Sequence, residues 1–204
     1  MWPQSDIDMI DVTTSNYMNG SNPFLAYYMS VSGHFGYKKS DNSIVGKHWN
    51  LVKDLPYNEE TKGYLATQIE LDKALELLIQ RLEENDLLED TVIVLLADHY
   101  PYGLGDENIE TLVGHPLDAV ELHHTNLIIW NSEIKTKTID KPCMSIDVLP
   151  TVYNLFGLDY DSRLFMGKDI FSPTEGLAFL KDRSWVTSKG TYYASTGNFT
   201  PKNS

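Results

Sequence analysis

Apolar residues gather into three short runs and one long periodic segment along the chain. The runs PFLAYYMSVS (23–32), TVIVLLAD (91–98) and TNLIIWN (125–131) are rich in β-branched and aromatic residues, which is typical of strands buried in a core. Residues 58–85 repeat leucine at steps of four, three and four, and therefore predict an amphipathic helix whose stripe faces the core. This alternation of strand and helix indicates a layered α/β domain with a mostly parallel sheet.

The segments between these elements are polar and contain many turn residues. Residues 1–22 read as a leading segment with room for one short helix, and residues 33–57 and 99–124 read as long loops, which in compact domains are often functional. Residues 176–195 alternate well enough to predict a β-hairpin, with its turn at 188–190.

A second helix is expected after the third strand. Pro150 fits only within a first helical turn, so Asp147 is the predicted N-cap, and Gly157 is a natural stop. The face expected to be buried is formed by Leu149, Val152, Tyr153 and Phe156.

The composition narrows the possible functions. The 204 residues allow one domain or part of a larger one. A net charge of −13 argues against nucleic-acid binding, which needs Lys and Arg to neutralise phosphates. No apolar run reaches the roughly 18 residues of a membrane helix, so this chain is predicted to be soluble and to contain no transmembrane segment. Its one cysteine, Cys143, excludes an internal disulfide.

Candidate chemistry lies where two of the predicted strands end. Asp98 and His99 could bind one divalent metal, since zinc and manganese accept mixed nitrogen and oxygen ligands. The alternative is an aspartate that caps a loop and a histidine that bonds to it. His34 follows the flexible Gly33 and could contact an anionic oxygen or transfer a proton, or be a surface loop histidine. The remaining histidines, for which the sequence predicts no role, are His48, His115, His123 and His124.

The order of these motifs is similar to that of a known family. LEDTVIVLLADHYPYG and SIDVLPTVYNLFGLDYDSRLFMGKDIF resemble the second metal-ligand motif and the downstream block of the alkaline phosphatase and sulfatase superfamily. FLAYYMSVSGHFGY and RSWVTSKGTYY are similar to the lipoteichoic acid synthase branch, the membrane-anchored phosphoglycerol transferases of Gram-positive bacteria. The resemblance covers about residues 23–172 and the C-terminal hairpin. It implies an α/β/α sandwich, incomplete at its N-terminal side, with residues 1–204 as a single partial domain.

This resemblance also implies roles for individual residues. Asp98 and His99 match two ligands of the catalytic metal, which is manganese in lipoteichoic acid synthases, with zinc, calcium and magnesium as alternatives. His34 matches the histidine that contacts the glycerol phosphate group. In such enzymes a threonine attacks the phosphorus of phosphatidylglycerol, diacylglycerol leaves, and an acceptor then takes the glycerophosphate. The expected partner is an anionic phospholipid head group or a phosphate or sulfate ester. The full-length protein is expected at the extracellular face of the cell membrane.

The sequence departs from the family pattern at its N-terminal side, where the substrate-binding Trp and Arg and the membrane helices of the family are also missing. The family's nucleophile and its glutamate metal ligand belong upstream of the matched blocks, and no apolar strand precedes Thr13 and Thr14, so neither is assigned as the nucleophile. We therefore expect a C-terminal part of a catalytic domain whose partner is the missing N-terminal half. Alone it should be inactive and bind metal weakly. The alternatives are a sulfatase or phosphate-monoester hydrolase and a non-catalytic degenerate relative.

Overall fold

The computed structural model describes residues 4–34 and 36–202, so residues 1–3 of the leading segment and Phe35 of the SGHFGY motif lie outside the described residues. The chain divides into two compact units. Within the described ranges, no helix is both long enough and apolar enough to cross a membrane. The first unit comprises Met1–Leu95, His99–Pro116 and Leu127–Ile134, and the second comprises Leu96–Asp98, Leu117–Asn126 and Lys135–Ser204.

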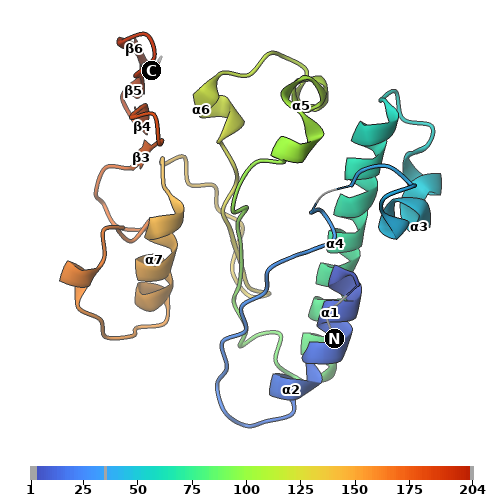
Figure 1. Cartoon of the computed structure of the whole chain (residues 1–204). Helices are drawn as coiled ribbons and strands as arrows, with labels where there is room; N and C mark the ends of the chain where they lie inside the picture. Colours follow the sequence, from blue (N-terminus) through green and yellow to red (C-terminus); the bar gives the residue numbers. More distant parts are fainter. Residues whose placement is uncertain (1–3, 35, 203–204) are drawn as a thin grey trace. The chain divides into compact units, whose positions relative to one another are not determined.

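The long helix predicted from the leucine repeat is confirmed as α4 (Glu59–Glu84). Asn58 caps its N-terminus, because its side-chain oxygen accepts a hydrogen bond from the backbone N–H of Thr61 at 2.9 Å. Two glutamates in the first turn complement the helix dipole. Figure 1 shows α1 (Asp6–Thr13) and α3 (Ser43–Val52) lying along α4, and both helices pack against it.

The face that α4 buries differs from the predicted one. Its fully buried positions are mostly small or polar residues, whereas only Leu82 of the leucine stripe is buried. Gly63 explains the difference, because a Cβ atom at this position would overlap the backbone carbonyl of Tyr37. Small side chains let neighbouring segments approach the helix backbone closely, so they occupy the packed face. The leucines that remain only half-buried are Leu71, Leu75 and Leu78.

The predicted loops contain helices that the apolar spacing did not reveal. The leading segment forms α1 and α2 (Ser15–Met18), and the expected loop at 33–57 contains α3. The expected loop at 99–124 contains a 3₁₀ turn at Tyr102–Leu104, α5 (Asp106–Val113) and α6 (Ala119–Leu122). These helices are ten residues or shorter, which leaves too few turns for a clear periodic pattern.

Two of the three predicted strands form, but they are short. β1 (Ile93–Leu95) pairs with β2 (Ile128–Trp130) in an antiparallel register that runs from Ile93 opposite Trp130 to Leu95 opposite Ile128. The side chain of Asn131 closes this ribbon by donating to the carbonyl of Glu89 at 2.7 Å. Both sheets of the described chain are antiparallel, so the parallel pairing expected from the strand–helix alternation is absent from them.

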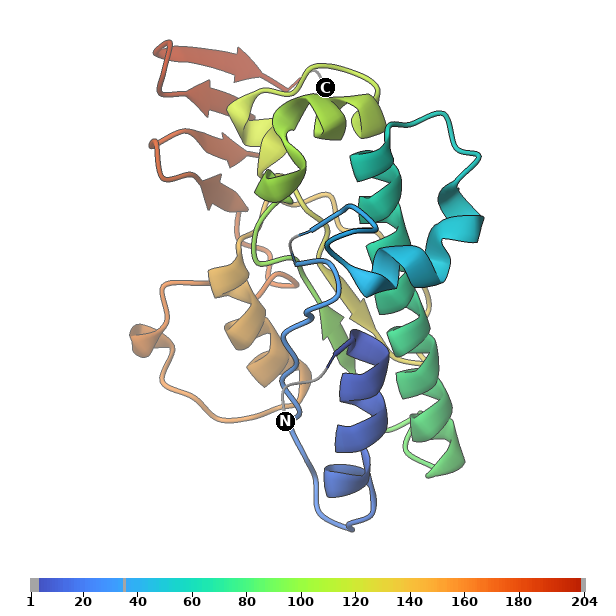
Figure 2. The ribbon, with the colours of Figure 1, turned by 45° about the vertical axis from the view of Figure 1, so that its right-hand side comes forward.

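The run at 23–32 is not a strand in this chain, and the prediction that it is buried on both faces is wrong. Residues 23–30 are extended, but no backbone–backbone hydrogen bond joins them to any described residue. Figure 2 accordingly draws this stretch as a coil after α2. One side packs on the helices, since the Tyr28 hydroxyl bonds Thr13 at 2.7 Å and Tyr17 at 2.8 Å. The other side is open to solvent, with Leu25 84%, Tyr27 82% and Met29 66% exposed.

The second unit ends in a four-stranded antiparallel sheet (Figure 2). Thr187 pairs with Gly190, so Ser188 and Lys189 form the two-residue turn of the predicted hairpin, which is confirmed. The structure adds one strand on each side of this hairpin. In chain order the strands are β3 (Leu177–Phe179), β4 (Trp185–Thr187), β5 (Gly190–Tyr193) and β6 (Asn198–Pro201).

The predicted helix near Asp147 is confirmed as α7 (Val148–Leu155), but its expected buried face is wrong. Pro150 and Thr151 are buried, whereas Leu149 is 47% and Phe156 is 50% exposed. The Thr151 hydroxyl accepts a hydrogen bond from the backbone N–H of Ile170 at 2.9 Å, which fastens the following loop to the helix. The covered face of α7 is therefore the one that carries Pro150 and Thr151.

Candidate functional site

His34 lies in a turn that is anchored on its N-terminal side by Asp6, the first residue of α1. The buried Asp6 carboxylate accepts hydrogen bonds from the backbone N–H groups of Val31 at 2.7 Å and Ser32 at 3.2 Å. In return, the Ser32 hydroxyl accepts a hydrogen bond from the backbone N–H of Asp6 at 2.8 Å. These reciprocal bonds, buried away from water, hold the chain just before the candidate histidine.

A second anchor follows His34 on the surface of α4. The Tyr37 hydroxyl donates to the carbonyl of Gly33 at 3.1 Å, and its ring meets Tyr64 edge to face at 5.5 Å. Burial raises the pKa of Tyr37 above its ordinary value. A Cβ at Gly33 would lie 2.9 Å from the side-chain amide nitrogen of Gln68, the end of a flexible side chain. The exposed His34 is thus presented by a turn with firm supports on both sides.

Asp98 and His99 follow β1 in an exposed bend, as the sequence predicted. The Nδ1 atom of His99 lies 2.7 Å from the carbonyl oxygen of Tyr100. A carbonyl oxygen can only accept, so Nδ1 is the donor in this contact. The Tyr102 ring lies 4.8 Å away and packs against the imidazole. Metal-binding histidines are oriented by this kind of bond from the second ring nitrogen.

The donor atoms of Asp98 and His99 fit part of a divalent metal site. A carboxylate oxygen and an imidazole nitrogen are both good ligands for manganese and zinc. Within the described residues, however, no three His, Cys, Asp or Glu side chains are grouped so that they could hold a metal ion. His34 and His99 belong to the first unit and Asp98 to the second, so each is described by itself. This chain therefore offers two ligands, and a catalytic site needs further ones.

A buried polar cluster on α3 and α4 was not predicted from the sequence. Glu70 is fully buried, and its carboxylate receives hydrogen bonds from His48 at 2.5 Å and Lys47 at 2.9 Å. Burial alone raises the pKa of Glu70, but the hydrogen bonds from His48 and Lys47 outweigh it and hold the pKa below its ordinary value. The expectation that His48 lies in a loop without a partner is thus wrong. His48 and Glu70 are 22 residues apart in the chain, so no local sequence pattern marks this pair.

Two further histidines and Thr13 contact backbone carbonyls close by in the chain. The Nδ1 atom of His123 lies 2.7 Å from the carbonyl of Ala119 at the end of α6, and that of His115 lies 2.8 Å from the carbonyl of Pro116. The Thr13 hydroxyl donates to the carbonyl of Met9 at 2.6 Å within α1.

Comparison with known proteins identifies the family. The sequence model of the Sulfatase family matches residues 2–158 of the chain. The chain belongs to the sulfatase family. This sulfatase-family chain is 27% identical over 156 residues to a lipoteichoic acid synthase of Staphylococcus saprophyticus, a match that covers 74% of the chain and 23% of that protein. It is 23% identical to the lipoteichoic acid synthase-like YvgJ of Bacillus subtilis, covering 96% of the chain and 32% of that protein.

Solved structures of the same superfamily share the fold. The crystal structure of the lipoteichoic acid synthase LtaP from Listeria monocytogenes matches with a TM-score of 0.73 and 19% identity, covering 92% of this chain and 48% of that one. A Vibrio parahaemolyticus protein of the alkaline phosphatase superfamily matches with a TM-score of 0.66 and 17% identity, covering 98% and 50%. The predicted alkaline phosphatase/sulfatase-like α/β fold and the resemblance to lipoteichoic acid synthases are therefore confirmed.

The matches also define what share of a relative this sulfatase-family chain represents. It spans about a quarter to a third of the two curated proteins and about half of the two solved chains. Proteins of this superfamily generally depend on divalent metals, which agrees with the donor atoms of Asp98 and His99. Its relatives come from Staphylococcus, Bacillus and Listeria, in line with the predicted Gram-positive type.

Proposed function

We propose that the chain forms the C-terminal part of the catalytic domain of a metal-dependent phosphoglycerol transferase. The observation that carries this proposal is the Asp-His motif in the bend that follows β1, where the Nδ1 atom of His99 lies 2.7 Å from the Tyr100 carbonyl oxygen. It occurs in a chain whose curated matches are lipoteichoic acid synthases. In this assignment Asp98 and His99 are metal ligands, and His34 contacts the glycerol phosphate. The donor is phosphatidylglycerol, and the full-length protein acts at the outer face of the cell membrane.

The metal would be Mn²⁺, held by the Asp98 carboxylate and the His99 Nε2 atom together with ligands from outside this chain. When bound, it neutralises charge on the phosphoryl oxygens and lowers the pKa of an attacking hydroxyl. The nucleophilic threonine and the other ligands belong to the N-terminal part of the fold. Within this chain, His34 would orient the glycerol phosphate, because the two anchors around its turn fix where the imidazole is presented.

The open side of residues 23–30 supports the N-terminal part of the fold as the partner. Leu25, Tyr27 and Met29 alternate along an extended segment and are exposed together, while the backbone of the segment makes no sheet bonds to described residues. Unpaired backbone and a row of apolar side chains are the features of a strand that awaits a neighbour. In LtaP, about half of the chain lies outside the match and could supply such a neighbour.

Titration of the purified chain with Mn²⁺ tests this assignment. We expect binding weaker than about micromolar, because two protein ligands rarely hold a catalytic metal tightly. That binding should disappear in Asp98→Ala and persist in the control Asp106→Ala, an exposed aspartate on α5. We also expect no turnover of phosphatidylglycerol. Sub-micromolar binding that is lost in Asp98→Ala, or turnover by the chain alone, would contradict a two-ligand, incomplete site.

A sulfatase or phosphate-monoester hydrolase is the second candidate, because the matching family model is that of the sulfatases. A form of the protein that includes the N-terminal part of the fold separates the candidates. The transferase should release diacylglycerol from phosphatidylglycerol in the presence of Mn²⁺, whereas the hydrolase should cleave simple aryl sulfates or phosphates. Absence of metal-dependent activity on all these substrates would instead indicate the non-catalytic relative.

A further inference from the structure

One face of the four-stranded sheet carries a row of aromatic side chains. The strand register places Phe179 opposite Trp185, Trp185 opposite Tyr192, and Tyr192 opposite Phe199. Residues directly opposite each other share a face of a sheet, so the four rings form one continuous row. The row is tightly associated, with Trp185 stacked on Tyr192 at 5.5 Å and 5.6 Å from Phe199.

This aromatic row is partly open to solvent. Phe179 is 46% and Phe199 is 45% exposed, and Leu177, two residues before Phe179 on the same face, is 49% exposed. The opposite face carries Val186 opposite Thr191 at its centre, and its one ring in β3–β6, Tyr193, donates its hydroxyl to Asp118 at 2.7 Å. An antiparallel sheet normally covers its more apolar face and exposes the polar one. The exposed aromatic row thus marks a surface for contact.

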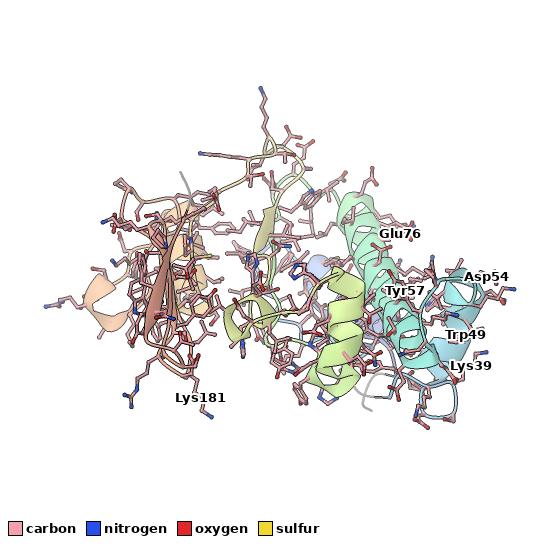
Figure 3. All side chains as sticks on the ribbon, turned by 90° about the horizontal axis from the view of Figure 1, so that it is seen from above. Lys39, Trp49, Asp54, Tyr57, Glu76 and Lys181 are labelled. Atoms are coloured by element: carbon pink, nitrogen blue, oxygen red, sulfur yellow. The ribbon has the colours of Figure 1, made fainter. Side chains whose placement is uncertain are left out.

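The sheet is also the basic part of an acidic chain. Residues 177–202 contain four Lys or Arg and one Asp, whereas the whole chain has 16 Lys and Arg against 29 Asp and Glu. Lys181 and Arg183 are exposed in the turn between β3 and β4, and Figure 3 shows Lys181 at the margin of the sheet. Lys189 and Lys202 pair with Glu175 and Asp140, but such exposed pairs contribute little and open readily.

We propose that this aromatic face binds the anionic surface of a phospholipid bilayer. Aromatic rings with one polar edge favour the head-group region, and Lys and Arg beside them are attracted to anionic lipids. A chain of net charge −13 is on the whole repelled by an anionic membrane. The locally positive sheet is therefore the part of the chain that an anionic membrane attracts. The proposal does not depend on the catalytic assignment, since binding requires neither the metal nor turnover.

Flotation of the purified chain with vesicles tests the proposal. We expect binding to vesicles that contain phosphatidylglycerol, little binding to vesicles of phosphatidylcholine alone, and weakening as added salt shortens the screening length from about 10 Å at 0.1 M towards about 3 Å at 1 M. Equal binding to neutral vesicles, or no binding to either kind, would overturn it. Complete competition by soluble glycerol phosphate would show recognition of a free anion and would also overturn it.

Two matched pairs of variants locate the surface. Lys181→Glu with Arg183→Glu should weaken vesicle binding at least about tenfold, whereas Lys135→Glu with Lys137→Glu, the same charge change at exposed positions outside the sheet, should weaken it far less. The double variant Phe179→Ser with Phe199→Ser should weaken vesicle binding about as much as Lys181→Glu with Arg183→Glu does. Its control is Phe156→Ser with Phe171→Ser, because these rings are 50% and 51% exposed elsewhere in the same unit. Equal losses in test and control pairs would refute the proposed face.

Discussion

The packed face of α4 and the open side of residues 23–30 use opposite kinds of side chain. The packed face consists mainly of small and polar residues such as Gly63, Ala66 and Glu70, and it is fully buried. The open side consists of Leu25, Tyr27 and Met29, which are large and mostly exposed. Whether a surface of this chain is buried therefore depends on whether another segment packs against it, and not on how apolar its side chains are. Helices α1 and α3 approach α4 closely, whereas no described segment pairs with residues 23–30.

The largest effect should come from adding one methyl group to the packed face. Gly63→Ala places a Cβ on the backbone carbonyl of Tyr37, where no side chain can move aside, and should cost about 4 kcal/mol or more of the free energy of unfolding. Gly46→Ala on α3 is the control, since a Cβ there meets nothing within 4 Å. The control should be neutral or stabilising by about 0.5–1 kcal/mol. Chemical denaturation of both variants measures the contrast, and equal effects would refute the close packing.

Removing the buried charge should have the next largest effect. Glu70→Gln leaves His48 and Lys47 without their carboxylate partner and should cost about 3 kcal/mol near neutral pH. Because the pKa of Glu70 is lowered in the folded chain, its stabilising contribution is present above the ordinary value of about 4.3 and is lost as the pH falls through the folded pKa. Denaturation between neutral and acidic pH should therefore show a steeper loss of stability in the native chain than in the variant.

Glu76→Gln is the matched control for the buried charge. Glu76 is exposed on the same helix, and Figure 3 shows it projecting outward from α4. Surface substitutions of this kind usually change stability by less than about 0.5 kcal/mol. A pH profile of Glu70→Gln that matches that of Glu76→Gln would show that the buried network does not contribute to the acid sensitivity.

The smallest effect is expected on the open side of residues 23–30, and the same substitution on the packed face of α4 gives the direct comparison. Leu82→Ala removes a side chain that is only 1% exposed and should cost about 3 kcal/mol. Leu25→Ala makes the same chemical change at 84% exposure and should lie within about 0.5 kcal/mol of the native chain. Thermal or urea denaturation compares the two. A loss in Leu25→Ala as large as that in Leu82→Ala would mean that the segment is covered in solution.

Prediction from the sequence worked where neighbouring residues carried the signal. The leucine repeat predicted α4, the Ser188–Lys189 turn predicted the hairpin, and the Asp-His motif was placed correctly after a strand. The short helices were missed because one or two turns give no periodic pattern. The predicted buried face of α7 was wrong, and the Thr151 bond to Ile170 on the face that is covered is made across 19 residues, beyond any local pattern.

The sequence named candidate site residues, which stay predictions, but it did not reveal the contacts that hold them. His34, Asp98 and His99 were all named from their positions after apolar runs. The bonds from Asp6 to the turn before His34 span 25 and 26 residues, so no local pattern reveals them. The His99 contact likewise depends on a bend that brings the Tyr100 carbonyl back to the ring.

The sequence by itself determined the type of fold, the long helix, the hairpin turn and the residues with metal-ligand chemistry. These features depend on side-chain type and on spacing over a few residues, and both can be read directly from the amino-acid sequence. Only the tertiary structure decided which face of α4 is packed, how Glu70 keeps its charge in the interior, and that the apolar residues 25, 27 and 29 stay exposed. Each of these depends on which distant segments come into contact, because burial and hydrogen bonding are properties of the neighbours as much as of the residue.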